Sequence, residues 1–435
     1  MKKINVLATL LLFSLACSAL FGQDLGDVNH DNEVNIVDAL LVAKYYVNDI
    51  PSGFDAALAD VDCDASINIV DALNIARFYV RLISELPCGH TPTPTVTQTP
   101  TPVVNPGADY LLVGRFTNET APRFAWSAST IKANFSGTEV SVKLASTGDN
   151  YIEVIVDGQV KAPVNVPSGS SGSSAILLAS GLSNGNHSIE IVKRTEAHVG
   201  DMQFFGFEYG SGRALAAPAP SSRRIEFIGD SITCGYGNEG NDRNQPFTTR
   251  KENAYMAYGA LTGRLVNADA VTVCWSGKGV IRNYGGDTNN VMPQVYDQIL
   301  AYNTSLLWDY SKWIPQVVVI NLGTNDYSVG NPDRAQFTTA YRNLVTKVRG
   351  HYPSAYIYVA LGPLQYGDGL ISARDYLSSI VTGFNNSGDS KIRFIEFPQQ
   401  DGSLGYGEDW HPTVATHQQM AGILAAKIRS DLGWN

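Results

Sequence analysis

The sequence predicts a chain of several domains: a small all-α module, an all-β domain of the jelly-roll or sandwich type, and an α/β domain with a parallel sheet. The 435 residues exceed the usual length of one domain, which is roughly 100 to 200 residues. Residues 91–107 are dominated by Pro and Thr, which is typical of an extended linker. The pattern of apolar residues changes after this linker and again near residue 219. With 44% hydrophobic and 17% charged residues, the composition excludes a mostly disordered chain.

The first 23 residues have the features of a signal peptide. Lys2 and Lys3 precede a short apolar run over residues 6–21, so we expect a secreted, extracellular protein. A membrane anchor at this end and a lipid anchor on Cys17 are the alternatives. No later stretch is apolar enough to span a membrane, and the net charge of −10 argues against nucleic acid as a partner.

Residues 24–90 contain an internal repeat of acidic and amide side chains. The two copies begin at Asp27 and Asp60, and an apolar helical stretch follows each. Oxygen-bearing side chains stand at the same five positions in both copies: Asp27, Asn29, Asp31, Asn35 and Asp38, then Asp60, Asp62, Asp64, Asn68 and Asp71. Ca²⁺ prefers six to eight converging oxygen ligands, so the repeat predicts two calcium sites. A solvated acidic loop is the alternative, but it would not repeat its spacing.

This repeat resembles a type I dockerin, a calcium module that binds a cohesin on a scaffold protein, over about residues 25–85. The usual Gly at the sixth loop position is replaced by Asn32 and Ala65, which predicts strained or weak sites. The positions that select the cohesin in dockerins are apolar in both copies, Ile36-Val37 and Ile69-Val70, which implies an unusual cohesin partner. Cys63 and Cys88 either form a disulfide or are free thiols.

Residues 108–218 show the alternation of an all-β domain. Short apolar runs such as 140–144 and 152–156 are separated by Gly, Ser and Asn, and the turn dipeptide Asp157-Gly158 follows the second run. The spacing predicts a jelly roll or sandwich.

Residues 219–435 read as an α/β domain. The expected buried strands are 225–228, 270–273, 317–320, 356–361 and 392–397, and helical stretches separate most of them. This alternation predicts a parallel sheet, in which chemistry gathers at the carboxyl ends of the strands.

Polar residues with the chemistry of acyl transfer follow these strands. Ser231, after Gly229-Asp230, is placed to act as a nucleophile. Gly277 and Asn325 each follow a strand and offer a backbone N–H and a side-chain amide to an oxyanion. His411, just before the last helical stretch, is placed to act as general base. Each motif alone could be an ordinary turn or helix cap, but their order together favours a hydrolase.

The four motifs resemble the blocks of the SGNH (GDSL-type) hydrolases, over residues 223–435, and the resemblance implies a flavodoxin-like parallel sheet. It makes Ser231 the nucleophile, His411 the base, and Gly277 and Asn325 the oxyanion partners of the Ser231 amide. Most such enzymes place an acid three residues before the His, which is Glu408 here, whereas Asp409 lies two before.

The β domain together with Asp409-Trp410-His411-Pro412 resembles carbohydrate esterase family 2 more specifically. That family removes acetyl groups from plant polysaccharides, and some members orient the His with a backbone carbonyl instead of an acid. The resemblance favours Asp409 over Glu408 and implies no metal or cofactor in catalysis. Trp410 is expected to line the acyl pocket, to bind sugar or to pack beneath the His loop. Cys234 and Cys274 follow strands that are neighbours in this fold, which suggests a disulfide.

The sequence therefore predicts a secreted, cellulosome-type deacetylase of acetylated xylan or glucomannan that carries Ca²⁺ in its dockerin-like module and binds a cohesin. One alternative is a scaffold-recruited glycan-binding protein with weak catalysis. The other is an SGNH lipase or thioesterase that prefers longer acyl chains.

Overall fold

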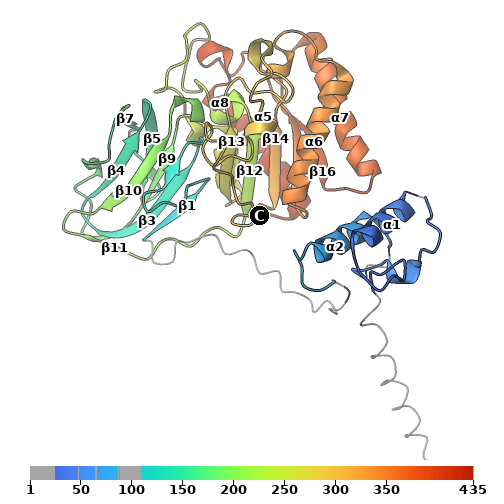
Figure 1. The fold of residues 1–435 in the computed structure, drawn as a ribbon. Helices are drawn as coiled ribbons and strands as arrows, with labels where there is room; N and C mark the ends of the chain where they lie inside the picture. Colours follow the sequence, from blue (N-terminus) through green and yellow to red (C-terminus); the bar gives the residue numbers. More distant parts are fainter. Residues whose placement is uncertain (1–24, 48, 64–65, 87, 89–108, 435) are drawn as a thin grey trace, which may run out of the picture. The chain divides into compact units, whose positions relative to one another are not determined.

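The computed structural model describes residues 25–47, 49–63, 66–86, 88 and 109–434. The chain divides into two compact units, 1–98 and 99–435, and each is described by itself (Figure 1). The predicted signal peptide, Cys17 and the linker lie outside the described residues, as do Asp64 and Ala65. Within the described part of the chain, none of the helices combines the length and the hydrophobicity needed to cross a membrane.

The first unit contains two equivalent helices, α1 (Ile36–Tyr46) and α2 (Ile69–Tyr79), with the short 3-10 helix η1 (Ala56–Leu58) between them. Each helix begins with a capping box, formed by Asn35 and Asp38 in α1 and by Asn68 and Asp71 in α2. A small core lies between the helices, and it is built from Val28, Ala39, Val42, Ala59, Val61, Ala72 and Ile75. The all-α module predicted from the repeat is confirmed.

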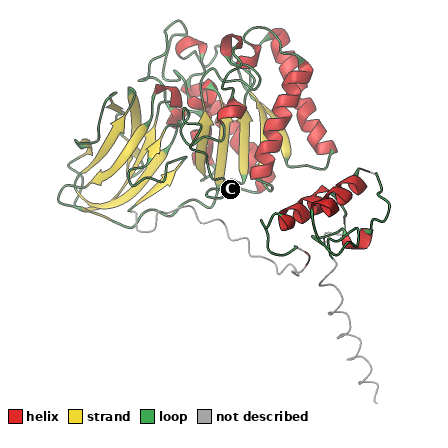
Figure 2. Ribbon diagram, in the orientation of Figure 1, coloured by secondary structure: helices red, strands yellow, loops and turns green. Residues whose placement is uncertain are grey.

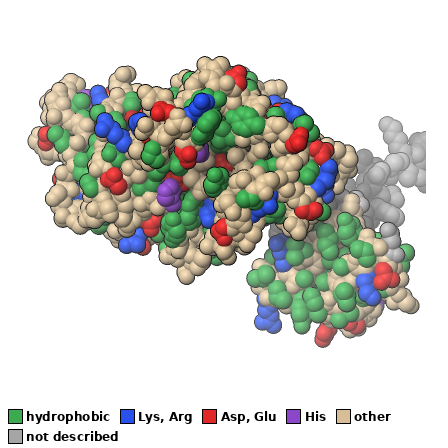
Figure 3. Space-filling view, turned by 90° about the horizontal axis from the view of Figure 1, so that it is seen from above, with side chains coloured by type: hydrophobic (Ala, Val, Ile, Leu, Met, Phe, Trp, Pro, Cys, Tyr) green, Lys and Arg blue, Asp and Glu red, His purple; other side chains and the backbone are tan. Residues whose placement is uncertain are grey.

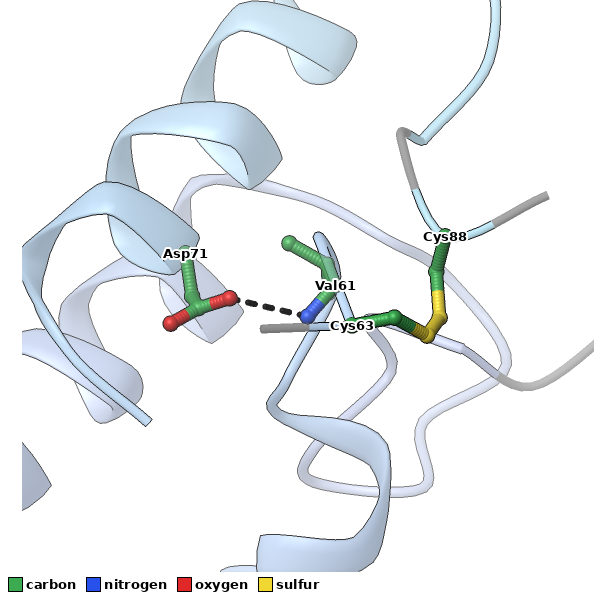
Figure 4. Close-up of a disulfide and its surroundings, with 4 residues drawn as sticks. All are labelled: Val61, Cys63, Asp71 and Cys88. Atoms are coloured by element: carbon green, nitrogen blue, oxygen red, sulfur yellow. Dashed lines mark hydrogen bonds between the residues drawn. A yellow bond between two sulfur atoms is a disulfide. The ribbon is translucent and has the colours of Figure 1, made fainter. Parts of the chain in front are cut away.

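A disulfide joins Cys63 to Cys88 (Figure 4). The Val61 N–H, two residues before Cys63, donates to Asp71 Oδ1 at 2.9 Å, so the cross-link lies beside the start of α2. At the sixth position of the first loop, Asn32 has a φ of 66°. Asn tolerates this left-handed conformation better than most residues, which explains how the loop turns there without Gly.

The β domain is a sandwich of two antiparallel sheets (Figure 2). The larger sheet has the order β1-β3-β9-β5-β6, with β11 beside β3 and β7 beside β5, and the smaller has the order β2-β10-β4-β8. The strands are β1 (Tyr110–Val113), β2 (Arg123–Phe124), β3 (Thr130–Gly137), β4 (Val140–Ser146), β5 (Asn150–Val156), β6 (Gln159–Val160), β7 (Val164–Val166), β8 (Ile176–Ala179), β9 (Gly185–Lys193), β10 (Met202–Glu208) and β11 (Arg213–Ala214). Asp157 and Gly158, both with positive φ, form the tight turn between β5 and β6, as their sequence predicts.

The α/β domain has a five-stranded parallel sheet with the order β13-β12-β14-β15-β16. Its strands are β12 (Arg224–Gly229), β13 (Asp269–Cys274), β14 (Val317–Asn321), β15 (Tyr356–Leu361) and β16 (Ile392–Glu396). The helices are α3 (Ser231–Cys234), α4 (Tyr258–Leu265), α5 (Met292–Val295), α6 (Arg334–His351), α7 (Gly367–Asn386) and α8 (Val414–Leu432), and the 3-10 helices are η4 (Ala254–Met256), η5 (Tyr284–Gly286), η6 (Asn325–Tyr327) and η7 (Glu408–Trp410). Because β13 and β14 lie on opposite sides of β12, the strand order reverses there, which is where such sheets bind ligands.

Alternate residues of the strands face two separate cores, so the sheet is covered on both sides. Phe227 and Val319 pack with residues of α4 and α8, whereas Ile228 and Ile320 pack with residues of α5, α6 and α7. Strands buried on both faces are continuous apolar runs, which is the pattern that predicted them. The multidomain fold class is therefore confirmed.

The β domain and the α/β domain share a buried ion pair. Arg115, on the segment after β1, donates to Glu226 Oε1 at 2.8 Å, and Glu226 lies on the central strand β12. Both side chains are completely enclosed, and the guanidinium lies 5.0 Å from the centre of the Tyr296 ring. Breaking a buried pair leaves an unpaired charge, which costs about 3–5 kcal/mol, so this contact ties the two domains firmly.

Candidate active site

Ser231 is placed by the turn that follows the central strand β12. It is the first residue of α3, and the preceding Asp230 caps this helix by accepting from the Ile232 N–H at 3.1 Å. A Cβ on Gly229 would lie 2.0 Å from Thr233 Oγ1, so only Gly fits immediately before this turn. Burial, together with the charge of nearby Asp326, raises the pKa of Asp230 to about 7. The sequence Gly-Asp-Ser therefore presents the Ser231 hydroxyl at the carboxyl edge of the sheet.

His411 lies on the loop before α8 and contacts Ser231 directly. Its Nε2 is 2.9 Å from Ser231 Oγ, and its Nδ1 is 2.9 Å from the backbone carbonyl oxygen of Asp409. A carbonyl only accepts hydrogen bonds, so Nδ1 carries the proton and Nε2 is free to accept from the serine. The ring of Tyr236 packs against the imidazole with their centres 4.1 Å apart. This geometry is that of a nucleophile with its general base.

Neither candidate carboxylate contacts His411 Nδ1, although the sequence favours the Asp409 carboxylate as the group that orients the imidazole. Asp409 and Trp410 both have left-handed φ values, 48° and 64°, and in this turn it is the Asp409 carbonyl that contacts the imidazole. The Asp409 carboxylate instead accepts from Tyr236 Oη at 3.4 Å. The arrangement corresponds to the third option that the sequence left open, a Ser-His pair oriented by a backbone carbonyl.

The Glu408 carboxylate contacts residues other than His411. Its carboxylate is buried and accepts from the Thr248 N–H and the Thr248 hydroxyl, each at 2.8 Å, with Lys251 Nζ 3.5 Å away. These contacts join the loop that carries His411 to the segment 242–251. Glu408 therefore stabilises the loop and does not orient the imidazole.

The two expected oxyanion partners line the same cleft as Ser231. Gly277 follows β13 with a φ of 78°, and its carbonyl accepts from the Tyr284 N–H at 2.8 Å. Asn325 begins η6 after β14, and its Nδ2 donates to the Lys278 carbonyl at 2.8 Å. The same Nδ2 also makes a longer contact of 3.5 Å with Asp230 Oδ2. A substrate oxygen placed closer to Nδ2 would replace this weaker second bond.

The cleft has a volume of about 870 Å³ and is mostly aromatic and polar. Trp410 and Tyr284 stand at its surface with 51% and 74% of their area exposed. The guanidinium carbon of Arg243 lies 4.3 Å from the centre of the Trp410 ring. The centres of the Tyr406 and Trp410 rings are 5.5 Å apart. Seen from above, the molecule shows a few histidine side chains among hydrophobic and other side chains (Figure 3). Trp410 thus lies open to a ligand rather than packed beneath the His loop.

Cys234 and Cys274 are both buried and free, so the disulfide suggested for them is wrong. Cys234 Sγ instead donates to Glu196 Oε2 at 3.6 Å. Burial raises the pKa of the Cys234 thiol, and its neighbours Cys274 and Glu196 raise it further, so the sulfur stays protonated and serves as a donor.

The carboxylates of the repeat in the first unit converge in two groups. One oxygen from each of Asp27, Asp31 and Asp38 lies within 4.8 Å of the others, and the same holds for Asp60, Asp62 and Asp71. Asn35 and Asn68 cap their helices, and Asn29 contacts Asp31 at 2.9 Å. Hard oxygen ligands grouped in this way fit Ca²⁺.

Two residues near the Ser231–His411 pair, Tyr236 and Glu196, were not predicted as site residues. Tyr236 lies in the conspicuous stretch after Ser231, but no spacing rule shows that its ring packs on His411. Glu196 belongs to the β domain and lies in no motif, so its contact with the segment before Gly277 is visible only in the structure.

The fold is that of an ester hydrolase of the GDSL type. The GDSL-like lipase/acylhydrolase family model matches residues 225–424, the carbohydrate esterase 2 N-terminal model matches residues 112–219, and the dockerin type I domain model matches residues 25–78. A family two carbohydrate esterase from Clostridium thermocellum, solved in complex with cellohexaose, is 50% identical with a TM-score of 0.73 and covers 75% of this chain and 100% of its own. This chain belongs to carbohydrate esterase family 2, and the predicted carboxylic ester hydrolase class is confirmed at that level.

Two curated relatives extend this comparison. The cellulase/esterase CelE of Acetivibrio thermocellus is 49% identical over 414 residues, which cover 94% of this chain and 49% of that protein. This chain thus spans about half the length of that relative. An acetylxylan esterase / glucomannan deacetylase of Cellvibrio japonicus is 26% identical over 317 residues, covering 72% of this chain and 85% of that protein.

The carbonyl contact predicts that the Asp409 carboxylate is dispensable. In a Ser-His-Asp triad, changing the Asp to Asn lowers kcat by about 10⁴-fold because the imidazole adopts the wrong tautomer. Asp409→Asn keeps the backbone carbonyl, so we expect a loss in kcat of less than about tenfold. Steady-state kinetics on a soluble acetyl ester measure this, with His411→Ala as the inactive control. A loss comparable to that of His411→Ala would show that the carboxylate is the orienter.

The environment of His411 predicts activity under mildly acidic conditions. Burial lowers the pKa of His411 below 6.5, and the bond to the Asp409 carbonyl, with the charges of Asp409 and Glu196, offsets only part of this effect. The imidazole must be neutral to accept the serine proton, so activity is present above this pKa and lost as the pH falls through it. A profile of kcat/KM from about pH 4 to 8 should show an acid limb centred below 6.5. A midpoint above 6.5 in a protein that stays folded would contradict this.

Proposed function

We propose that this protein is a secreted carbohydrate esterase that removes O-acetyl groups from plant hemicellulose, acetylated xylan or glucomannan. The observation that carries the proposal is the 2.9 Å contact between Ser231 Oγ and His411 Nε2 in an open, aromatic-lined cleft of a family two fold. A relative named acetylxylan esterase / glucomannan deacetylase supports the choice of substrate.

The proposed reaction proceeds through an acyl-enzyme. His411 Nε2 takes the proton from Ser231 Oγ, which attacks the acetyl carbonyl carbon. The oxyanion accepts from the Ser231 and Gly277 N–H groups and the Asn325 amide, and His411 then passes its proton to the departing sugar oxygen. Water, deprotonated by His411, then attacks the acetyl carbonyl carbon. The bond between this carbon and Ser231 Oγ breaks, His411 returns the proton to Ser231 Oγ, and acetate leaves. His411 Nδ1–H donates to the Asp409 carbonyl oxygen throughout, and no step in this sequence calls on a metal.

The aromatic side chains at the cleft surface support a sugar ligand. Trp410 and Tyr284 expose broad rings on the lining of the cleft that holds Ser231, and such rings are suited to packing against the apolar face of a pyranose. A carbohydrate chain lying across this surface would bring an acetyl group to Ser231.

A glycan-binding protein with weak catalysis is the second candidate. The family two esterase that is 50% identical was solved in complex with cellohexaose, and the exposed rings of this cleft suit an unacetylated glucan as well. The two candidates differ in whether Ser231 is needed for the protein's effect on its ligand. An SGNH lipase or thioesterase remains a third reading, which predicts faster turnover of long acyl chains.

Acetate release tests the proposed activity. We expect the full-length protein to release acetate from acetylated xylan or glucomannan, Ser231→Ala to release none, and Asn325→Ala to turn over about 10²- to 10³-fold more slowly because one oxyanion donor is lost. Binding of the Ser231→Ala variant to deacetylated polymer serves as the control for folding. Failure of the parent to release acetate while it binds the polymer would favour the glycan-binding candidate. Faster hydrolysis of long-chain esters than of acetate would favour the lipase.

The first unit is proposed to bind two Ca²⁺ and a cohesin on a scaffold protein, in the manner of a cellulosome. The carboxylates that converge at each loop support the calcium sites. Ile36 and Ile69, at equivalent places in the two copies, expose 51% and 52% of their area, and Val37 and Val70 beside them are also exposed. Exposed apolar side chains at these positions support an apolar contact surface on the partner. Figure 3 shows many hydrophobic side chains on the visible face of this unit.

The secreted location and the predicted domain boundaries remain parts of this proposal. The dockerin type I match supports an extracellular, scaffold-associated enzyme. The boundaries proposed are 24–90 for the module, 91–107 for the linker, 108–218 for the β domain and 219–435 for the catalytic domain, and residues 1–23 are the proposed signal peptide.

Calcium removal should abolish binding to a cohesin but leave hydrolysis of an acetyl ester in place. Without the cation, the carboxylates at each loop repel one another, so a chelator is expected to abolish binding of the full-length protein to a cohesin. Hydrolysis of an acetyl ester should stay within about twofold, because the catalytic steps are carried by Ser231 and His411. Binding and turnover are measured on the same sample, and added Ca²⁺ should restore binding. Loss of turnover on chelation, reversed by a divalent metal, would contradict the proposed mechanism.

A further inference from the structure

A buried carboxylate of the β domain contacts a segment of the α/β domain that lines the cleft. Glu196 follows β9 and precedes the 3-10 helix η3 (Ala197–Val199), and its side chain is completely buried. Its nearest partner in the other domain is Ser276, the residue immediately before Gly277. No other buried acidic side chain of the described β domain is hydrogen-bonded to the segment that supplies an oxyanion donor.

Both hydrogen-bond donors of Ser276 are bound by this one carboxylate. The Ser276 N–H donates to Glu196 Oε2 at 2.6 Å, and the Ser276 hydroxyl donates to Glu196 Oε1. On the other side, the Gly277 carbonyl accepts from the Tyr284 N–H at 2.8 Å. The Gly277 N–H lies between these two anchors. Its direction therefore depends on the position of the Glu196 carboxylate.

Glu196 is itself fixed by its surroundings. His198 Nδ1 lies 3.2 Å from Oε2, Cys234 Sγ donates to the same oxygen at 3.6 Å, and the Glu196 N–H donates to Glu252 at 3.0 Å. Cys234 ends the short helix that Ser231 begins, so the carboxylate contacts the segments of both the nucleophile and Gly277. Lys193 Nζ, also buried, donates to the Glu196 carbonyl at 3.0 Å.

The charge state of Glu196 agrees with this role. Burial opposes ionisation, but the hydrogen bonds and charge of His198 and the bonds from Ser276 outweigh it and lower the pKa of Glu196. Burial and the charge of Glu196 raise the pKa of neighbouring Glu252, which therefore stays protonated beside it. An ionised carboxylate accepts two strong hydrogen bonds, as Ser276 requires.

We propose that Glu196 is a positioning residue of the esterase, through which the β domain holds the Ser276–Gly277 segment in the geometry that binds the oxyanion. The inference rests on the proposed function, since it assigns a supporting role to the same reaction. Oxyanion donors act only at about 2.7–3.1 Å, and a misplacement of about 1 Å costs on the order of 10²-fold in rate. The β domain is then an integral part of the catalytic site and not a separable sugar-binding module.

Kinetics of Glu196 variants in the full-length protein test this. The substrates are 4-nitrophenyl acetate, which needs no sugar contacts, and an acetylated xylan. We expect Glu196→Ala to lower kcat on both by about 10²-fold with KM changed by less than about threefold, because the oxyanion exists only in the transition state. Glu196→Gln keeps the shape of the side chain and one hydrogen-bond acceptor, so its kcat should be about tenfold higher than that of Glu196→Ala.

Lys132→Met is the matched control. Lys132 on β3 makes another contact between the domains, to Asp269 Oδ1 at 3.1 Å, but Asp269 begins β13 at the edge of the sheet opposite the cleft. We expect this variant to keep the parental kcat. Thermal unfolding of all variants shows whether each is folded, and Glu196→Gln provides the test if Glu196→Ala does not fold.

The results separate this inference from the proposed function. A kcat within about twofold of the parent in folded Glu196→Ala, or in Glu196→Gln if the alanine variant does not fold, would overturn the role of Glu196 and leave the esterase intact. An equal loss of kcat in Lys132→Met would also overturn the role of Glu196, because weakening any contact between the two domains would then lower kcat in the same way. A parent that hydrolyses 4-nitrophenyl acetate but not acetylated polysaccharide would refute only the substrate.

Discussion

The 2.9 Å hydrogen bond between Ser231 Oγ and His411 Nε2 is the contact on which the rest of the active site depends. Its two ends come from opposite ends of the α/β domain: Ser231 follows the first strand of the sheet, and His411 precedes the last helix. The chain has to hold both to within a few tenths of an ångström. It does so at the serine with a Gly-Asp turn, and at the histidine with a loop joined to the segment 242–251 by the buried Glu408. The carboxylate at the usual acid position, that of Glu408, thus stabilises the loop, and the backbone carbonyl of Asp409 orients the base.

The β domain contributes to the same geometry from outside the sheet. Arg115 pairs with Glu226 on the central strand, and Glu196 contacts Ser276 beside the proposed oxyanion donor. Both contacts join a buried charge to a segment of the α/β domain, and a buried charge is costly to separate from its partner. The two domains therefore behave as one unit around the cleft, whereas the dockerin type I repeat forms a unit of its own.

Local patterns explain which features could be predicted from the sequence. The strands of the parallel sheet are mainly apolar runs, and the repeats that begin at Asp27 and Asp60 each predict a capped helix. In both cases the signal lies in consecutive residues. The order of Ser231, Gly277, Asn325 and His411 was informative for a similar reason, since each follows or precedes a recognisable element. The orientation of the Asp409 carbonyl could not be predicted, because it depends on two left-handed residues in succession. Glu196 and the free Cys234 depend on contacts between distant segments, which no spacing in the sequence reveals.

The most direct test of the central claim is to label the nucleophile. A fluorophosphonate that mimics the tetrahedral intermediate should react once per chain, and mass spectrometry of the digested protein should place the adduct on Ser231. The His411→Ala variant should remain unlabelled over the same period, because the hydroxyl has lost its base. An enzyme that turns over acetyl esters but stays unlabelled, or carries the label on another residue, would contradict the account of the Ser231–His411 pair as the catalytic centre.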